Sequence, residues 1–124
     1  MIDTLHAELF QSDGSAVLMM RGEIDMASAP VFDEAMARTM ALGMPVVLDF
    51  ADVTFMDSSG LNVLILAETT SKRPLSMCVR HPCEQVSRLL TMTGLERLID
   101  AGSAPCAADD VSEQGVVPDN GPRP

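Results

Sequence analysis

Residues 46–61 read VVLDFADVTFMDSSGL. The apolar run Pro45–Phe50 is typical of a strand buried on both faces, and Val53–Met56 leads it on to a junction. The junction, Asp57–Gly60, consists of small and polar residues of the kind that begin helices. After it, Leu61–Ser71 predicts a helix whose apolar face is formed by four side chains: Leu61, Leu64, Ile65 and Ala67. A strand, a short turn and a helix in this order predict one βα unit of an α/β fold.

Two strands are predicted before this unit. Leu5–Phe10 alternates between apolar and polar residues, and Ala16–Met20 is a short apolar run. Between them, Gln11–Ser15 has the turn chemistry of a β-hairpin. We therefore expect these two strands to be antiparallel neighbours.

A helix is predicted between the hairpin and residue 46. It begins near Ser28, with Pro30 in its first turn, and Gly43 ends it. Its apolar face repeats every four residues: Phe32, Met36 and Met40.

The chain continues with a strand at Leu75–Arg80 and a helix that Pro82 opens. Gly94, followed by Leu95, ends this helix. Its core face is predicted to hold four side chains: Val86, Leu89, Leu90 and Thr93. A short additional strand at Leu98–Ile99 is an alternative. The order of elements predicts an α/β fold with a mixed sheet of four to five strands and helices packed against it.

The 124 residues make up one domain of ordinary size. We place the folded domain at residues 1–100. Residues 101–124 form an acidic tail with seven Gly or Pro, four acids against one Arg, and no Leu, Ile, Met or aromatic residue. Such a composition buries too little apolar surface to offset the entropy of ordering, so we predict that the tail is disordered.

The charge balance of the chain argues against some classes of binding partner. Eight Lys and Arg stand against 18 Asp and Glu, a net charge of −10. This charge repels nucleic acid and anionic lipid, and the chain has no Trp or Tyr to stack on bases. No apolar run approaches the roughly 20 residues that a membrane helix needs, and the N-terminus lacks the pattern of a secretory signal. We expect a cytoplasmic protein.

The chain has too few cysteine and histidine residues for a fold that depends on several disulfide bonds or on a bound metal ion. Cys78, Cys83 and Cys106 are an odd number without a CxxC spacing, and only two His accompany them. The sequence therefore predicts no disulfide framework, no zinc site and no cofactor, and we expect reduced thiols.

We expect the functional site of the protein at the junction Asp57–Gly60. The first N–H groups of a helix are unpaired and carry partial positive charge, which stabilises a phosphate. Ser58 or Ser59 is therefore a candidate phosphoacceptor. The alternative on spacing alone is that Ser58 is simply the N-cap of the helix.

The serines of this junction do not match a known arrangement of catalytic residues. A nucleophile elbow needs glycine two residues before the serine, and Met56 and Asp57 occupy those places. His6 and His81 are the only candidate bases, and no motif positions either of them. Asp25 and Asp57 could form a metal or acid–base pair, but carboxylates at loop ends are more often solvated or capping groups. We predict that the protein is not an enzyme.

Three segments resemble the landmarks of STAS domains. Residues 46–61 resemble the family signature, most closely that of the bacterial anti-sigma factor antagonists. Arg21–Asp25, followed by Ala27–Pro30, resembles the second landmark, and Leu89–Leu95 resembles the third. All three occur in family order within residues 5–100, and the resemblance implies a STAS-like mixed β-sheet. Asn62 departs from the family's second glycine, and the usual last helix is not recognisable after residue 100.

The resemblance implies a non-catalytic protein that binds an anti-sigma factor with serine kinase activity and so releases a sigma factor. The phosphoacceptor of the family falls on Ser58, and its phosphorylation switches the protein off. Asp57 and Asp25 are the matched acidic positions. The implied switch surface also includes Ser59, Gly60 and Asn62. A monomer or weak dimer is expected.

The main alternative within STAS-like proteins is a docking or regulatory subunit of a membrane transport assembly or of a stressosome. A small hydrolase that uses Ser58 is a further alternative of a different class, but it lacks a base and an oxyanion site.

Overall fold

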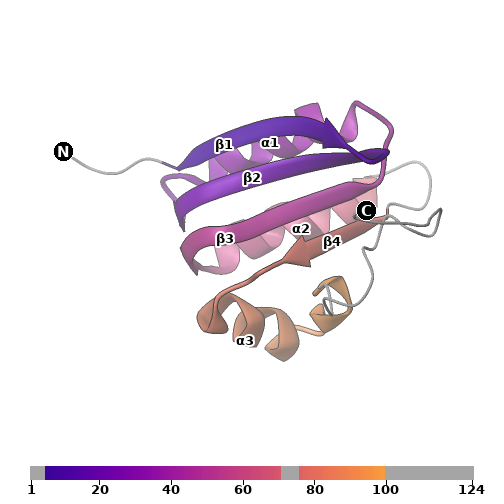
Figure 1. The fold of residues 1–124 in the computed structure, drawn as a ribbon. Helices are drawn as coiled ribbons and strands as arrows, with labels where there is room; N and C mark the ends of the chain where they lie inside the picture. Colours follow the sequence, from indigo (N-terminus) through magenta and orange to yellow (C-terminus); the bar gives the residue numbers. More distant parts are fainter. Residues whose placement is uncertain (1–4, 71–75, 100–124) are drawn as a thin grey trace.

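The computed structural model describes residues 5–70 and 76–99, which form one mixed four-stranded sheet with helices packed against it (Figure 1). The strand order is β1-β2-β3-β4. β1 is antiparallel to β2, whereas β2, β3 and β4 are parallel neighbours. The predicted α/β class and mixed sheet are confirmed. The tail from residue 101 lies outside the described residues.

The elements follow the predicted order. The strands are β1 (His6–Ser12), β2 (Ser15–Ile24), β3 (Val46–Met56) and β4 (Met77–Arg80). The helices are α1 (Ala29–Met40), α2 (Ser58–Thr70), α3 (Glu84–Met92) and the 3₁₀ turn η1 (Glu96–Leu98). The two predicted pieces of the central strand form one continuous strand, β3. β4 is short and pairs only with Val46–Asp49 of β3.

The hairpin between β1 and β2 closes through a two-residue turn. Asp13 and Gly14 both have positive φ, 52° and 80°, which is the requirement of a type I′ turn. Ser12 pairs with Ser15 across it. The register puts Ala7 and Leu9 toward the helices, and His6, Glu8 and Phe10 are exposed.

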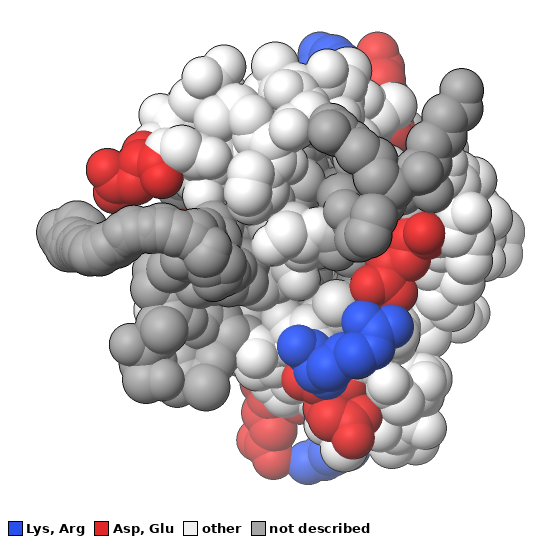
Figure 2. Space-filling view, turned by 90° about the vertical axis from the view of Figure 1, so that its right-hand side faces the viewer, with Lys and Arg blue, Asp and Glu red and all other residues white. Residues whose placement is uncertain are grey.

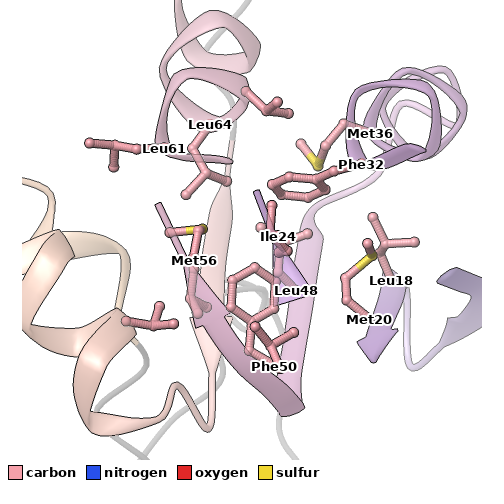
Figure 3. Packing of buried hydrophobic residues seen from close by; sticks show 14 of the residues in the cluster. Leu18, Met20, Ile24, Phe32, Met36, Leu48, Phe50, Met56, Leu61 and Leu64 are labelled. Carbon is pink, nitrogen blue, oxygen red and sulfur yellow. The ribbon is translucent and has the colours of Figure 1, made fainter. Parts of the chain in front are cut away.

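The core lies between the sheet and the helices. Figure 3 shows Phe32 and Met36 of α1 and Leu64 of α2 directed toward the sheet. Phe32 packs edge-on against Phe50, with ring centroids 6.1 Å apart. The predicted face of α1 is confirmed, with Met40 partly buried at its end.

The predicted core face of α2 is corrected at one position. Leu61 and Leu64 are buried, but Ile65 is 39% exposed, as is its neighbour Leu66 at 46%. Ala67 is buried as expected, and Val63 is buried in place of Ile65. Because α2 is apolar nearly all round, periodicity did not show which apolar residues face the sheet.

The end of α3 has the predicted glycine motif. Gly94 has a φ of 82°, its N–H donates to the carbonyl of Thr91, and the N–H of Leu95 donates to the carbonyl of Leu90 at 2.8 Å. Leu95 is buried, as this motif requires. Thr93, which we expected on the core face, is exposed and caps the helix end. In place of a fifth strand, Ile99 forms a single parallel bridge with Val79.

A charged pair ties η1 to α2. Both guanidinium nitrogens of Arg97 donate to the Glu68 carboxylate at 2.9 Å. These hydrogen bonds hold the pKa of Glu68 below its ordinary value. The Glu68 side chain is 23% exposed and that of Arg97 is 60% exposed.

This pair predicts a pH dependence. A carboxyl with a depressed pKa in the folded state stabilises the fold at neutral pH and loses this contribution as pH falls through the carboxyl range. Arg97→Ala should therefore lower the free energy of unfolding by at most about 1 kcal/mol at neutral pH, and by less in acid. Urea unfolding at several pH values measures this difference. Arg88→Ala breaks the more exposed Glu84–Arg88 pair and serves as a control. A cost for Arg97→Ala that is constant with pH would contradict the prediction.

The surface charge is predominantly acidic. On the side shown in Figure 2, the acidic groups of the described residues are scattered, and the basic atoms that are coloured lie beside acidic ones. No helix in the described ranges is both long enough and apolar enough to cross a membrane.

The expectation for the cysteines is corrected. Cys83 is a free thiol, but Cys78 is disulfide-bonded.

Candidate functional site

The candidate site lies where β2 and β3 end, at the left of the sheet in Figure 1. Ile24 pairs with Met56, the last residue of each strand, and the N–H of Asp57 donates to the carbonyl of Ile24 at 3.0 Å. The two predicted acidic positions, Asp25 and Asp57, therefore follow neighbouring strands at the same end of the sheet.

Asp57 is the N-cap of α2. Its Oδ1 accepts a hydrogen bond from the N–H of Ser59 at 2.8 Å, and its carbonyl accepts from the N–H groups of Gly60 and Leu61. These bonds satisfy donors at the helix start that would otherwise be unpaired. The alternative that Ser58 caps the helix is thus wrong, because the helix begins one residue earlier than that alternative required.

Ser58 is the first residue of α2 and is exposed. Among the described residues, its hydroxyl has no hydrogen-bond partner, since Asp57 has taken the capping role. The hydroxyl is therefore accessible to another molecule while lying at the positive end of the helix dipole. Ser59 is only half exposed.

Asp25 organises the start of α1. Its Oδ1 accepts from the N–H of Ser28 at 3.0 Å and from the Ser28 hydroxyl at 3.1 Å. In return the N–H of Asp25 donates to the Ser28 hydroxyl oxygen at 3.0 Å. Ser28 also donates to the carbonyl of Glu23 at 2.8 Å. Asp25 thus contributes to the turn as well as to the acidic charge near α2, and Ser28 is a residue that the sequence reasoning did not single out for this role.

Gly60 lies beneath the exposed first turn of α2. It is buried, and a Cβ at this position would lie 2.6 Å from Cγ2 of Ile24 and 2.6 Å from Cγ of Met56. Because real Cβ atoms do not approach so closely, only glycine lets α2 pack this near the strand ends. Gly60 therefore acts by setting the position of Ser58 above it rather than by forming part of the exposed surface.

Gln85 of α3 fixes the last residue of β3. Its Oε1 accepts from the N–H of Met56 at 2.9 Å, and its Nε2 donates to the carbonyl of Met56 at 2.8 Å. β4 is too short to pair with this part of β3, so one side chain supplies the two hydrogen bonds of a missing strand neighbour. Sequence reasoning missed Gln85, because the two residues are 29 positions apart and no local pattern connects them.

Replacing Gln85 tests this role. Gln85→Ala leaves both backbone groups of Met56 without their partner, and should lower the free energy of unfolding by about 1–3 kcal/mol. Amide hydrogen exchange at Met56 should accelerate together with this loss. Ser87→Ala, on the same helix, is the control and should change neither quantity. Unchanged exchange at Met56 in Gln85→Ala would show that the side chain does not hold the strand end.

One exposed stripe runs along α2 from the candidate phosphoacceptor. It contains Ser58, Asn62, Ile65, Leu66 and Thr69, all of which are exposed. The spacing of i, i+4, i+7, i+8 and i+11 places them on one side of a helix. Asn62 is therefore on the same surface as Ser58, as expected, and Ile65 and Leu66 add apolar area to it.

Comparisons with known proteins identify the family. A model of the STAS domain matches residues 6–110. The anti-sigma-B factor antagonist of Bacillus subtilis (strain 168) is 30% identical over 97 residues, which cover 77% of this chain and 89% of that protein.

Solved structures agree with this assignment. The crystal structure of an anti-sigma factor antagonist from Mycobacterium paratuberculosis matches with a TM-score of 0.70 and 27% identity, covering 77% of this chain and 83% of that one. The Bacillus cell fate determinant SpoIIAA in its phosphorylated form shares the fold, with a TM-score of 0.58 and 17% identity over 77% of this chain and 89% of that one. The chain therefore belongs to the STAS domain family.

Proposed function

We propose that the protein is an anti-sigma factor antagonist, which binds an anti-sigma factor with serine kinase activity and is switched off by phosphorylation of Ser58. Two similar proteins, from Bacillus subtilis and Mycobacterium paratuberculosis, are an anti-sigma-B factor antagonist and an anti-sigma factor antagonist. Binding of this kind takes place in the cytoplasm and requires no catalytic group on this chain.

The observation that carries the proposal is that Asp57, and not Ser58, caps the helix. Asp57 caps α2 through Oδ1 and its carbonyl, so the exposed Ser58 hydroxyl is not needed for the fold. A kinase can reach it without unfolding the helix. The added phosphoryl group brings about −1.5 to −2 charge beside the Asp57 carboxylate.

The stripe on α2 supports a protein partner. Ile65 and Leu66 are exposed, and Ser58 lies at the stripe's N-terminal end. A partner that covers Ile65 and Leu66 buries apolar area and also encloses Ser58. A phosphate enclosed in this way must lose its water, which weakens the complex without any change in the antagonist's fold.

Substitution at Ser58 tests the proposal directly. With a candidate kinase partner and ATP, wild type and Ser59→Ala should be phosphorylated, and Ser58→Ala should not. Ser58→Ala should bind the ADP-loaded partner as wild type does, because its removal leaves the cap intact and costs less than about 0.5 kcal/mol of stability. Ser58→Asp should bind at least about tenfold more weakly, since its charge partly imitates the phosphate.

The readouts are phosphate mapping by mass spectrometry and partner affinity by calorimetry. Phosphate on Ser59 in place of Ser58, or equal affinity of wild type and Ser58→Asp, would contradict the proposal. Asp25→Ala is expected to reduce the rate of phosphorylation of Ser58. Because this substitution also removes the hydrogen bonds from Ser28 to Asp25, the rates should be compared at a temperature where wild type and variant are equally folded.

A further inference from the structure

The outer edge of β1 is unpaired. β1 stands at one end of the strand order, and no strand among residues 5–70 and 76–99 lies beyond it (Figure 1). An unpaired edge exposes a row of backbone N–H and C=O groups, which is a template for pairing with another strand. This edge of the sheet is therefore open to a partner strand.

The hairpin turn determines which backbone groups of β1 face outward. The residues that flank a two-residue turn exchange both of their hydrogen bonds, and hydrogen-bonded pairs recur at every second residue from there. Ser12 and Ser15 are this first pair. The even-numbered residues of β1 are therefore bonded to β2, and the odd-numbered residues direct their N–H and C=O groups to the outer edge: Ala7, Leu9 and Gln11.

An exposed apolar flank of α1 lies beside the same edge. Ala29 and Met40 lie to one side of the core face of the helix and are partly buried, as expected of the side that meets α2. Val31 and Leu42 lie to the opposite side and are 41% and 39% exposed. Figure 1 shows α1 behind β1 and β2, and α2 below it. The flank with Val31 and Leu42 therefore faces the side of the free edge of β1.

We propose that the partner strand is β1 of a second copy of this chain. Two antiparallel β1 strands related by a two-fold axis join the two sheets into one and put both α1 helices on the same face of it. Strands lie about 4.8 Å apart. Because α1 packs over β1 and β2, the axes of the two α1 helices come to about 10 Å, the spacing of packed helices. Val31 and Leu42 of each copy then lose contact with water.

Charge selects the register of the two strands. Paired residues lie on the same face of the sheet, so the two-fold axis passes beside a residue of β1. An axis at Glu8 places two carboxylates opposite each other, and an axis at Leu9 places the Glu8 carboxylate opposite the Phe10 ring. An axis at Ala7 places Glu8 opposite His6 of the second copy, twice by symmetry. The axis at Ala7 is thus the one that gives each Glu8 a hydrogen-bond donor.

Arg21 adds positive charge beside His6. His6, Arg21 and Asp52 lie in register across β1, β2 and β3, and together with Glu8 they line a hollow of about 230 Å³. Arg21 is exposed, and no ion pair among the described residues uses it. The Glu8 carboxylate of the second copy extends this row next to an imidazole and a guanidinium, whose charge complements its own.

The dimer leaves the candidate phosphoacceptor free. Ser58 begins α2, which lies over β3 on the far side of α1 from the free edge (Figure 1). A partner that covers the stripe on α2 and a second copy bound to β1 therefore do not exclude each other. This inference does not depend on the proposed function.

An exchange of charges tests the register. Sedimentation equilibrium of the full-length chain gives the dissociation constant of the dimer for wild type, His6→Glu, Glu8→Lys and the double variant. Each single substitution acts twice by symmetry and should raise this constant at least about tenfold. The double variant restores opposite charges and should return to within about threefold of wild type.

Asp33→Lys, on the α2 side of α1, is the control for a change in net charge and should not weaken the dimer. A wild type that stays monomeric at millimolar concentration, single variants with wild-type affinity, or a double variant no tighter than the single ones would overturn the proposal.

Two further variants test the backbone pairing and the α1 flank. Ala7→Pro removes an N–H that faces outward, and edge strands tolerate proline at such positions. Val31→Asp places a carboxylate on the exposed flank and leaves the hairpin unchanged. Each should raise the dissociation constant at least about tenfold, with folding checked by circular dichroism. Wild-type affinity in Val31→Asp or in folded Ala7→Pro, or a dimer that non-reducing electrophoresis shows to be covalent, would overturn the proposal.

Discussion

Leu64→Ala is expected to lower the free energy of unfolding by about 2–5 kcal/mol. Leu64 is fully buried on the face of α2 that meets the sheet. Truncation removes its contacts and leaves a cavity between α2 and the strand ends, which the surrounding side chains refill only in part. Chemical denaturation with a fixed m-value measures the loss.

The neighbouring residue provides a matched control. Ile65 follows Leu64 on the same helix and is also a branched apolar residue, but it is 39% exposed. Ile65→Ala should cost much less than Leu64→Ala, since it loses little burial. Equal losses for the two variants would show that α2 is rotated relative to the structure described above.

Gly60→Ala is expected to cost about 2–3 kcal/mol, although alanine favours helices. The added methyl group meets Ile24 and Met56 at contact distances that no relaxed structure shows, and both of those side chains are fully buried. Either they leave their preferred rotamers or the first turn of α2 lifts away from the sheet.

Lifting the turn would displace Ser58, so this variant links stability to the site. Thermal unfolding gives the stability, and the rate of phosphorylation by the partner kinase at a temperature where the variant is folded gives the effect on the site. Asn62→Ala, one turn later and exposed, is the control for a helix substitution without a clash. A stable Gly60→Ala protein would mean that the helix does not approach the strands as closely as described.

Local patterns were sufficient to predict most of the architecture. The Asp13–Gly14 turn, the α1 face with Phe32 and Met36, and the Gly94–Leu95 helix end each depend on residues that are adjacent or one turn apart. Physical preferences that act over such short distances can be recognised in a single sequence.

What escaped prediction depends on contacts between distant residues or on small differences in boundary. Asp57 and Ser58 are both residue types that cap helices well. Which of them is the N-cap depends on whether the helix begins at residue 58 or at residue 59, and local sequence patterns do not fix a helix boundary to one residue. The bond from Gln85 to Met56 exists only because β4 is short.

The short β4 has a consequence for self-association. Beyond Asp49, no strand among residues 5–70 and 76–99 pairs with β3 on the β4 side. α3 lies along this region, with Gln85 bound to Met56 and the Cys83 sulfur 3.8 Å from the carbonyl of Thr54. Unpaired strand edges are templates for intermolecular β-pairing, and native proteins protect them with a helix or loop. α3 thus covers this edge and protects it from pairing with a strand of another molecule. Conditions that detach α3 before the sheet unfolds would expose the edge and favour aggregation.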